Sequence, residues 1–468
     1  MFLIFFVLLV VSTGDCILIG KIDNNILIGN ISKSLWNLTQ SQCTCEMINS
    51  NGTISTLNYF STNQTCQLFY TNCTSIFIEF NLNSSLIFIN QSAIFIAQKP
   101  TTTSTSTITT TTKTTTTAST TTTTTSCSTF LNQITYSVGI HPISVAVVDV
   151  NSDNKPDIIV ANQASNTVGI LLNTGNGTFN AQTTYAVGGA PSSVAVVDVN
   201  NDNKSDIVVG NFGSTTISVL LNAGNGVFNA QTIYTVGSNP WSVAVVDVNS
   251  DNKPDIVVAN TVDNTIGVLL NAGSGIFNAQ TTYAVGSHPR SVTVVDVNSD
   301  NKPDIVVANQ NSNTVGILLN AGNGIFNAQT TYTVGSAPFP VVVVDVNSDN
   351  KSDIVVANTG SNTVGVLLNA GSGTFSAQTT YPVDSEPYSV AVVDVNSDNK
   401  PDIVVENYGS NTVSVLLNAG SGTFNAQTTY AVGSEPYSVA VVDVNSDNKP
   451  DIIVANFNSN TVSVLLHC

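Results

Sequence analysis

The sequence predicts an all-β fold, a seven-bladed β-propeller with four strands per blade, preceded by a small domain that contains disulfides. Three observations support this prediction. A segment close to AVVDVNSDNKPDI recurs seven times, and its first aspartate moves by 49 residues at each step, from Asp149 to Asp443. Each copy holds short runs rich in Val, Ile and Thr between turn residues, which is typical of strands. The first and last copies are incomplete, in complementary ways.

Within one copy, the apolar pattern indicates four strands, at residues 193–199, 205–211, 217–223 and 227–236. No stretch shows a sustained 3.6-residue period with capping signals, so almost no helix is expected. Four strands in a repeat of this length are typical of a propeller blade. The alternative is an open solenoid, which would expose its edges and normally has atypical capping repeats.

The two ends of the array favour a closed ring. The array begins at Cys127 with a segment that resembles the fourth strand of a blade, and the last copy ends at Cys468 after three strands. Aligned on an intact blade, Cys127 stands at Ser421 and Cys468 at Ala419, so one residue is missing between them. Residues two apart have Cα atoms roughly 5.5 to 7 Å apart, which overlaps the span of a disulfide. We therefore predict that both ends form the seventh blade and that Cys127 and Cys468 pair.

The first residues predict secretion. An apolar run at 2–11 is too short to cross a bilayer and indicates a signal peptide over residues 1–14. No later segment is long and apolar enough to cross a membrane, so a secreted, extracellular protein without membrane insertion is expected.

Residues 15–98 form a region of different composition. It holds five cysteines, which together with dense glycosylation sequons indicate an oxidising, extracellular setting. If Cys127 and Cys468 pair, one of the five is unpaired or intermolecular unless cleavage removes Cys16. The pairing stays open among Cys16, Cys43, Cys45, Cys66 and Cys73, and the sequons are at Asn30, Asn37, Asn51, Asn63, Asn72, Asn83 and Asn90.

Residues 99–126 are almost pure threonine from residue 101 onward. Such a tract cannot bury a core, and in secreted chains it is usually an O-glycosylated, stiff linker. It separates the small domain from the propeller at 127–468.

The net charge of −18 argues for metal more than for a basic partner. Three aspartates in each of seven repeats make 21 of the 30 acidic residues. With 12 Lys and Arg and no basic patch, nucleic acid is excluded as an expected partner.

The loop after the first strand of each copy is the predicted metal site. In the first copy, Asp149, Asn151, Asp153 and Asp157 stand at positions 1, 3, 5 and 9, and Lys155 at position 7 offers its backbone carbonyl. Oxygen donors without His or Cys favour calcium over zinc or copper, up to seven ions. Asn154, at position 6, is expected to need a left-handed backbone. The corresponding residues are Asp198, Asn200, Asp202, Asp206, Asp247, Asn249, Asp251, Asp255, Asp296, Asn298, Asp300, Asp304, Asp345, Asn347, Asp349, Asp353, Asp394, Asn396, Asp398, Asp402, Asp443, Asn445, Asp447 and Asp451. The alternative is a set of Asp/Asn-rich turns that need no metal.

This D-x-N-x-D-x-x-x-D loop, following a β-strand in all seven copies, resembles the calcium-binding FG-GAP (VCBS-like) repeat of integrin α-subunit propellers. The resemblance covers residues 127–468 and implies that the loop joins the first two strands of a blade and that its metal is structural. Asn at position 6 departs from the usual Gly of the family. The stretch at 43–69 resembles apple or PAN modules; the alternative is an unclassified disulfide domain.

The copies differ from one another mainly in two loops, one around the proline before the first strand and one between the second and third strands. In a four-stranded meander these loops lie on one face, opposite the metal loops. Mixed aromatic and charged side chains there suit recognition of an extracellular protein or glycan by a monomeric propeller. The alternative is drift in unconstrained loops. The predicted ligand-face residues are His141, Phe212, Trp241, His288, Arg290, Phe339, Tyr388, Tyr408, Tyr437 and Phe457.

An enzyme is not expected, and no catalytic residue is assigned. The sequence has no G-x-S-x-G, H-E-x-x-H or P-loop motif. Hydrolase or lyase chemistry would need pocket carboxylates such as Glu386, Glu406 and Glu435. The sequence is also compatible with a lectin-like propeller or with a passive spacer.

Overall fold

The computed structural model describes residues 129–468 and, before them, only the backbone of nine strands. The chain divides into two compact units, Met1–Thr121 and Thr122–Cys468, which are considered separately. The Thr-rich linker and Cys127 lie outside the described residues, as do the side chains of the PAN-like region and of the five cysteines before Cys127. Of the expected signal peptide, only the backbone of residues 7–12 is described. The first unit has sheets β1-β2-β3, β4-β5 and β6-β7-β8-β9, with strands β1 (Val7–Ser12), β2 (Asp15–Ile22), β3 (Asn25–Asn30), β4 (Thr44–Ile48), β5 (Ile54–Asn58), β6 (Thr65–Leu68), β7 (Ile76–Asn81), β8 (Ser85–Asn90) and β9 (Ala93–Ile96).

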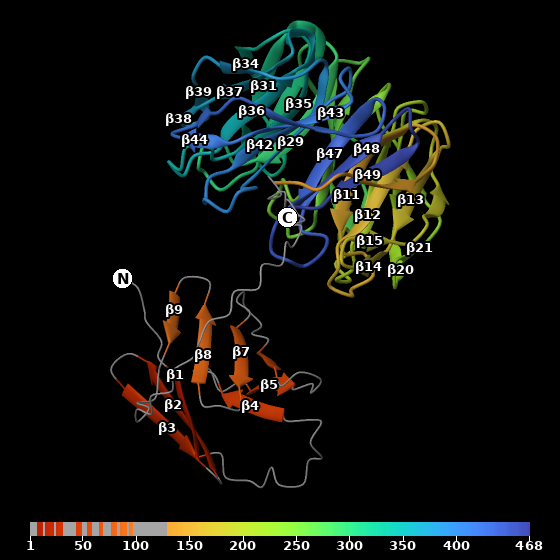
Figure 1. Ribbon diagram of the computed structural model, residues 1–468. Helices are drawn as coiled ribbons and strands as arrows, with labels where there is room; N and C mark the ends of the chain where they lie inside the picture. The colour runs from red at the N-terminus through yellow and green to blue at the C-terminus, as the bar shows by residue number, and fades with distance from the viewer. Residues whose placement is uncertain are drawn as a thin grey trace, which may run out of the picture. The chain divides into compact units, whose positions relative to one another are not determined.

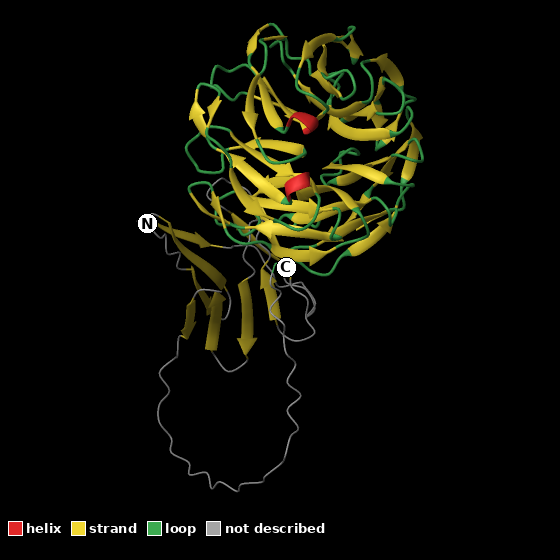
Figure 2. Ribbon diagram, turned by 90° about the horizontal axis from the view of Figure 1, so that it is seen from above, coloured by secondary structure: helices red, strands yellow, loops and turns green. Residues whose placement is uncertain are grey.

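The second unit consists of seven four-stranded antiparallel sheets arranged around an axis (Figures 1 and 2). The first strands of neighbouring blades contact one another in a closed circle and so form the inner ring. These inner strands are β11 (Pro142–Val148), β17 (Pro191–Val197), β23 (Pro240–Val246), β29 (Pro289–Val295), β35 (Pro338–Val344), β41 (Pro387–Val393) and β47 (Pro436–Val442). The prediction of a seven-bladed all-β propeller is therefore confirmed.

The second and third strands complete the buried part of each blade. The second strands are β12 (Asp157–Asn162), β18 (Asp206–Asn211), β24 (Asp255–Asn260), β30 (Asp304–Asn309), β36 (Asp353–Asn358), β42 (Asp402–Asn407) and β48 (Asp451–Asn456). The third strands are β13 (Thr167–Leu171), β19 (Thr216–Leu220), β25 (Thr265–Leu269), β31 (Thr314–Leu318), β37 (Thr363–Leu367), β43 (Thr412–Leu416) and β49 (Thr461–Leu465).

The outer strands are the fourth strands of the blades, and one of them closes the ring. They are β10 (Ile134–Ser137), β16 (Thr183–Ala186), β22 (Thr232–Thr235), β28 (Thr281–Ala284), β34 (Thr330–Thr333), β40 (Thr379–Pro382) and β46 (Thr428–Ala431). Strand β10, from the start of the domain, pairs with β49 from its end, with Ile134 opposite Val464. The seventh blade, β10-β49-β48-β47, is thus built from both ends, as expected.

The expected fourth strand at 227–236 is wrong as a single element. The structure splits it into β21 (Val227–Phe228) and β22, and pairs β21 with β20 (Asn222–Gly224). The turn between β20 and β21 has φ values of 54° at Asn225 and 71° at Gly226, the left-handed pair that a two-residue hairpin needs. Five further hairpins repeat this one: β14 (Asn173–Gly175) with β15 (Thr178–Phe179), β26 (Asn271–Gly273) with β27 (Ile276–Phe277), β32 (Asn320–Gly322) with β33 (Ile325–Phe326), β38 (Asn369–Gly371) with β39 (Thr374–Phe375), and β44 (Asn418–Gly420) with β45 (Thr423–Phe424).

Helix is nearly absent from residues 129–468, as the sequence predicts. The described helices are the 3-10 turns η1 (Gln310–Ser312) and η2 (Thr359–Ser361), drawn in red in Figure 2. None of the helices in the described part of the chain is long and apolar enough to cross a membrane.

The core lies between neighbouring blades. Val208 and Ile217 of one blade pack with Ile256 and Val258 of the next, and each second strand is buried along its whole length. Burying one such side chain contributes roughly 1.5 to 3 kcal/mol. Each blade therefore covers the apolar face of its neighbour, which is why the array needs a closed ring.

Candidate functional site: the axial pocket and the aspartate loops

The two variable loops of each blade lie side by side. The N–H of Gln163, after β12, donates to the His141 carbonyl before β11 at 2.9 Å, and the N–H of Tyr408 bonds the Glu386 carbonyl at 2.9 Å. The aspartate loops join the opposite ends of the same strands. The sequence-based prediction that both variable loops share one face, opposite the aspartate loops, is confirmed.

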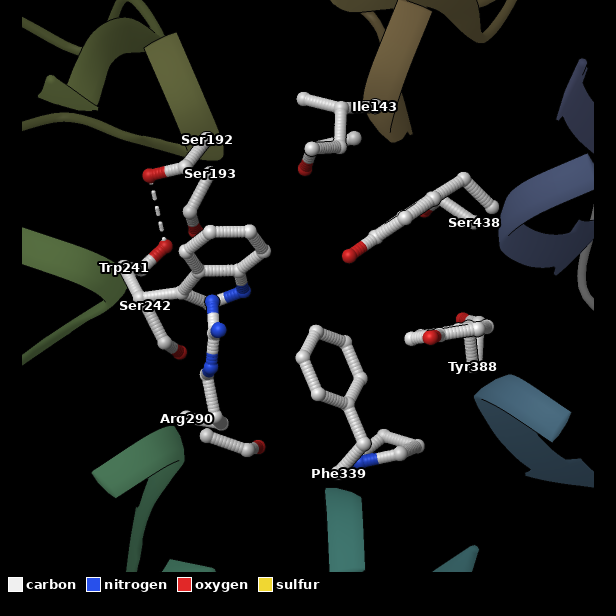
Figure 3. Close-up of a pocket in the computed structure, with 14 residues that line it drawn as sticks. Ile143, Ser192, Ser193, Trp241, Ser242, Arg290, Phe339, Tyr388 and Ser438 are labelled. Atoms are coloured by element: carbon white, nitrogen blue, oxygen red, sulfur yellow. Dashed lines mark hydrogen bonds between the residues drawn. The ribbon is translucent and has the colours of Figure 1, made fainter. Parts of the chain in front are cut away.

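A pocket opens on the propeller axis at this face. Its volume is about 160 Å³, and it is lined by the second and third residues of the seven inner strands. Figure 3 shows these side chains converging from the surrounding strands, with Trp241 and Arg290 on one side and Tyr388 on the other. We call this the axial pocket; it is lined by Ile143, Ser144, Ser192, Ser193, Trp241, Ser242, Arg290, Ser291, Phe339, Pro340, Tyr388, Ser389, Tyr437 and Ser438.

Five predicted ligand-face residues occupy inner strands, not loops. Trp241, Arg290, Phe339, Tyr388 and Tyr437 are each the second residue of their strand, directly after a proline. The assignment to loops was wrong because the strand begins at the proline itself. A side chain at that position faces the axis and lines the pocket.

The aromatic side chains are in mutual contact across blades. Phe339 contacts Trp241 edge-on at 5.8 Å between ring centroids, and Tyr388 at 5.2 Å. Tyr388 and Tyr437 are stacked at 4.9 Å. We call Trp241, Phe339, Tyr388 and Tyr437 the aromatic wall. Edge-on and offset ring contacts of this kind are favourable beyond their buried area, so the wall is held rigidly.

Four other predicted residues support the aromatic wall or continue it. Phe212 contacts Trp241 at 4.9 Å, and Tyr408 contacts Tyr388 at 5.1 Å. Phe457 contacts Tyr437 at 5.9 Å and stacks on His141 at 4.2 Å. The tenth predicted residue, His288, does not line the axial pocket; its backbone turns with a φ of 56°.

Arg290 is the single arginine of the sequence. Its guanidinium carbon lies 3.9 Å from the Trp241 ring centroid, and its Nε donates to Gln310 Oε1 at 3.1 Å. Its Nη1 is buried and has no hydrogen-bond partner among the described residues. Burial lowers the pKa of Arg290, while Tyr437 and Tyr388 across the pocket act in the opposite direction. An unpaired guanidinium N–H beside a pocket is a donor for an anionic ligand.

A circle of serine hydroxyls, not anticipated from the sequence, crosses from blade to blade below the aromatic wall. Each Oγ accepts the backbone N–H of a valine in the next inner strand, at 3.1 to 3.3 Å. Pro340 takes the equivalent position in β35 and has no hydroxyl. The recurrence of Ser two residues after the proline was the signal that the sequence contained. We call Ser144, Ser193, Ser242, Ser291, Ser389 and Ser438 the serine ring.

Removing one hydroxyl of the serine ring is expected to destabilise the propeller. Ser242→Ala leaves the Val292 N–H without its 3.2 Å acceptor, so the free energy of unfolding should fall by about 1 to 2 kcal/mol. Chemical denaturation of the full chain measures this. Thr281→Ala, on an exposed outer strand, is the control and should change stability by less than about 0.5 kcal/mol. Equal effects of the two substitutions would contradict the role of the serine ring.

The three carboxylates proposed for an enzyme do not line the axial pocket. Glu435 accepts a hydrogen bond from the Tyr408 hydroxyl at 2.8 Å; burial and this bond raise the pKa of Tyr408 to about 12. Glu386 is exposed in its loop. Glu406 is fully buried in β42, where the other six blades have Ala or Gly. The sequence could not place Glu406, because a strand pattern does not show which side chain another blade covers.

Glu406 is a buried carboxyl with an incomplete set of partners. Its Oε2 accepts the Tyr388 N–H at 3.2 Å, while Oε1 is buried without a partner among the described residues. Burial raises the pKa of Glu406 well above its usual value, and the backbone N–H groups of Tyr388 and Ser389 offset this only in part. Glu406 is therefore protonated over a wider pH range when folded than when unfolded.

Glu406 is expected to make the propeller less stable as pH rises. Because its pKa is higher in the folded protein, its contribution is most favourable below the unfolded pKa of about 4.3 and is lost as pH rises through the folded pKa. Glu406→Gln should therefore raise the free energy of unfolding at pH 8 by on the order of 1 to 3 kcal/mol, with a smaller gain at pH 4. Denaturation at several pH values measures this. Glu386→Gln, an exposed control, should match wild type, and a gain for Glu406→Gln that is constant with pH would contradict the prediction.

The aspartate loops are compact and closed by their own backbone. Asp149 accepts the N–H groups of Ser152 and Asn154, each at 2.7 Å. The φ of Asn154 is 63°, so the predicted left-handed backbone is confirmed. Asp153 pairs with the Lys155 amine at 3.2 Å. Asp157 accepts the N–H of Val150 at 3.0 Å from within the loop.

The donor set of these loops fits a hard divalent cation. Burial, together with the nearby charges of Asp202 and Asp198, raises the pKa of Asp206 to about 6, so the loop gathers negative charge that a cation would neutralise. Within residues 129–468, however, no three acidic, His or Cys side chains converge closely enough to hold a metal. In six of the seven loops the aspartate equivalent to Asp153 would have to exchange a lysine amine for the ion. The oxygen donors of the loops thus suit calcium, but the carboxylates are held by hydrogen bonds from backbone N–H groups and by lysine.

Comparison with known proteins supports the repeat and the fold. A sequence model of the FG-GAP-like repeat matches six overlapping spans, at residues 149–209, 198–258, 247–307, 296–356, 345–405 and 394–454, which together cover more than half of the chain. No curated protein sequence matches the chain.

Solved structures with a similar fold have different activities. A streptogramin B lyase is 15% identical, with 73% of this chain and 98% of that chain covered and a TM-score of 0.53. Virginiamycin B lyase from Staphylococcus aureus is 14% identical (71% and 99% covered, TM-score 0.51). BBS1N, solved in complex with ARL6DN, is 13% identical (72% and 96% covered, TM-score 0.52). Identities this low show a shared fold and no more.

Proposed function

Because the chain belongs to the FG-GAP-like repeat family, we propose that its propeller is a secreted, calcium-stabilised recognition module that binds an extracellular protein or glycan in the axial pocket. The observation behind this proposal is the contrast between the scaffold and the pocket. The blades are near copies, yet the residue after the inner-strand proline takes six identities in seven blades and supplies Trp241, Arg290, Phe339, Tyr388 and Tyr437. Trp, Tyr and Arg are the residues that dominate binding energy at interfaces.

The extracellular setting is proposed from the sequence. The apolar run at 2–11, the sequons of residues 15–98 and the Thr-rich linker all suit a secreted glycoprotein. An extracellular setting also provides millimolar calcium, the range in which extracellular calcium modules bind.

We propose binding in preference to catalysis. Two of the similar structures are lyases, so the same fold supports both roles. The residues that line the axial pocket offer hydroxyls, aromatic rings and one guanidinium, and among them no carboxylate or imidazole. General acid–base chemistry normally uses such groups, so the lining favours recognition.

The proposal is tested by binding of the full chain to an immobilised panel of neutral glycans, acidic glycans and extracellular-matrix proteins, in calcium. Trp241→Ala and Arg290→Ala should each weaken the strongest interaction by about tenfold or more, since truncation of such residues typically costs over 1 kcal/mol. Ile325→Ser, on hairpin β33 and 58% exposed, is the control and should bind like wild type. Binding that survives both pocket substitutions would overturn the proposal.

A further inference from the structure

We infer that the axial pocket binds a single acidic sugar residue, a hexuronate, with its carboxylate on Arg290. This inference rests on the proposed function and names the ligand class for it. Three features of the pocket point to this ligand: its one cation, its aromatic wall and its serine ring.

The position of the cation indicates an anionic group. In residues 129–468, all seven lysines stand in the aspartate loops, so Arg290 is the only lysine or arginine outside them. Its Nε is fixed by Gln310, and its buried Nη1 has no partner among the described residues. A guanidinium offers paired N–H donors that match the two oxygens of a carboxylate. The stacked Trp241 ring holds the guanidinium in place, which lowers the entropic cost of binding.

The lining is asymmetric in a way that suits a sugar ring. The side chains of the aromatic wall lie on strands β23, β35, β41 and β47. At the same position, strands β11 and β17 contribute Ile143 and Ser192. Ser192 is small and is already bonded to the Trp241 carbonyl at 2.8 Å, as Figure 3 shows. A sugar ring in the pocket therefore meets aromatic side chains from four strands and small or aliphatic side chains from β11 and β17.

The serine ring supplies hydroxyl donors to the same pocket. The hydrogen bonds described for its Oγ atoms are all accepted from backbone N–H groups. Since a hydroxyl that accepts one bond still has its own proton, each serine retains a donor for a ligand oxygen. The hydroxyl groups and the ring oxygen of a sugar can accept from several such donors around one ring, whereas an aspartate or glutamate side chain offers only its two carboxylate oxygens.

The size of the pocket limits the ligand. A volume of about 160 Å³ holds one small group and not an oligomer. A hexuronate combines in one ring the carboxylate, the hydroxyls and the C–H faces that the three features require. An acidic peptide side chain carries the carboxylate but has no ring to lie against the aromatic wall and no hydroxyl groups for the rest of the serine ring.

The test uses tryptophan fluorescence of the full chain carrying Trp36→Phe, which leaves Trp241 as its only tryptophan. The probes are methyl glucuronide, methyl glucoside and N-acetylglutamate. We expect methyl glucuronide to change the Trp241 emission and to bind about tenfold or more tightly than methyl glucoside, because hydrogen bonds to charged groups are stronger than those between neutral groups. Arg290→Gln should bind the two sugars about equally, and Arg290→Lys should retain only part of the preference.

Each outcome decides between the inference and the broader function. Preference for methyl glucoside or for N-acetylglutamate would overturn the acidic-sugar inference and leave the pocket as a recognition site for another ligand. Preference for methyl glucuronide that persists in Arg290→Gln would overturn the role of Arg290. No response to any probe, with panel binding that is still lost in Trp241→Ala, would overturn the inference alone. If no probe gives a response and Trp241→Ala does not weaken panel binding either, the proposed function is overturned as well.

Discussion

Calcium is expected to stabilise the propeller strongly. At a Kd of about 10⁻³ M, typical of extracellular modules, about 10 mM calcium would stabilise each site by about 1.4 kcal/mol. Seven independent sites would add up to about 10 kcal/mol, enough to raise the unfolding temperature by more than about 10 °C. Scanning calorimetry of the full chain in calcium and in chelator measures the shift, and isothermal titration measures the stoichiometry.

Two variants make the calcium result specific. Asp300→Asn alters one predicted loop and should reduce the stoichiometry from seven to six. Asp263→Asn removes a carboxylate from the opposite face, where Asp263 accepts the Ser238 N–H at 2.7 Å, and should leave the stoichiometry unchanged. Magnesium at equal ionic strength controls for charge screening. If calcium binds nowhere and shifts nothing, the loops are turns held by their N–H groups and lysines alone.

Breaking the seam of the seventh blade is expected to have a comparably large effect. A Cys127–Cys468 disulfide would close a loop of over 300 residues, which in the chain-entropy model contributes on the order of 4 to 5 kcal/mol. The structure brings the two ends together: the Cys468 N–H donates to the Thr129 carbonyl at 3.1 Å, and Phe130 forms a β-bridge with His467. Cys127→Ser with Cys468→Ser should therefore lower the free energy of unfolding by this amount, as measured by chemical denaturation.

The pairing itself stays a prediction, and peptide mapping under non-reducing conditions tests it. The Cys127→Ser single variant should be as destabilised as the double variant, since either change opens the same loop. The predicted seam would be contradicted if the double variant were as stable as wild type. It would also be contradicted if mapping linked Cys468 to a cysteine of residues 15–98. The bonds of β10 to β49 would then close the ring alone.

Much of the fold was predictable because the repeat is nearly perfect. The 49-residue step and the complementary ends require a closed ring whose last blade joins β10 to β47–β49. The Asn225-Gly226 turn lies between the predicted third and fourth strands, as expected, but the break after Phe228 and the pairing of β21 with β20 were missed. Residues that favour strands lie on both sides of the break, and strand propensity does not show where the chain changes its pairing partner.

The candidate site was predictable in composition but not in geometry. Differences among the copies identified nine residues that meet in one network of ring and cation contacts. They did not show that the residues after the prolines face the axis, that Ser242 and its equivalents cross between blades, or that Glu406 is covered by its neighbours. Those facts depend on how blades separated by 49 residues pack, which no local pattern encodes.

The sequence by itself thus determined the number of blades, their order and the face on which the copies differ, because each follows from repetition along the chain. Only the tertiary structure decided that Trp241, Arg290, Phe339, Tyr388 and Tyr437 share one pocket. Closing seven blades into a ring brings the second residues of all the inner strands to one axis, although they are 49 residues or more apart in the chain. Side chains that are distant in sequence become neighbours only through that closure.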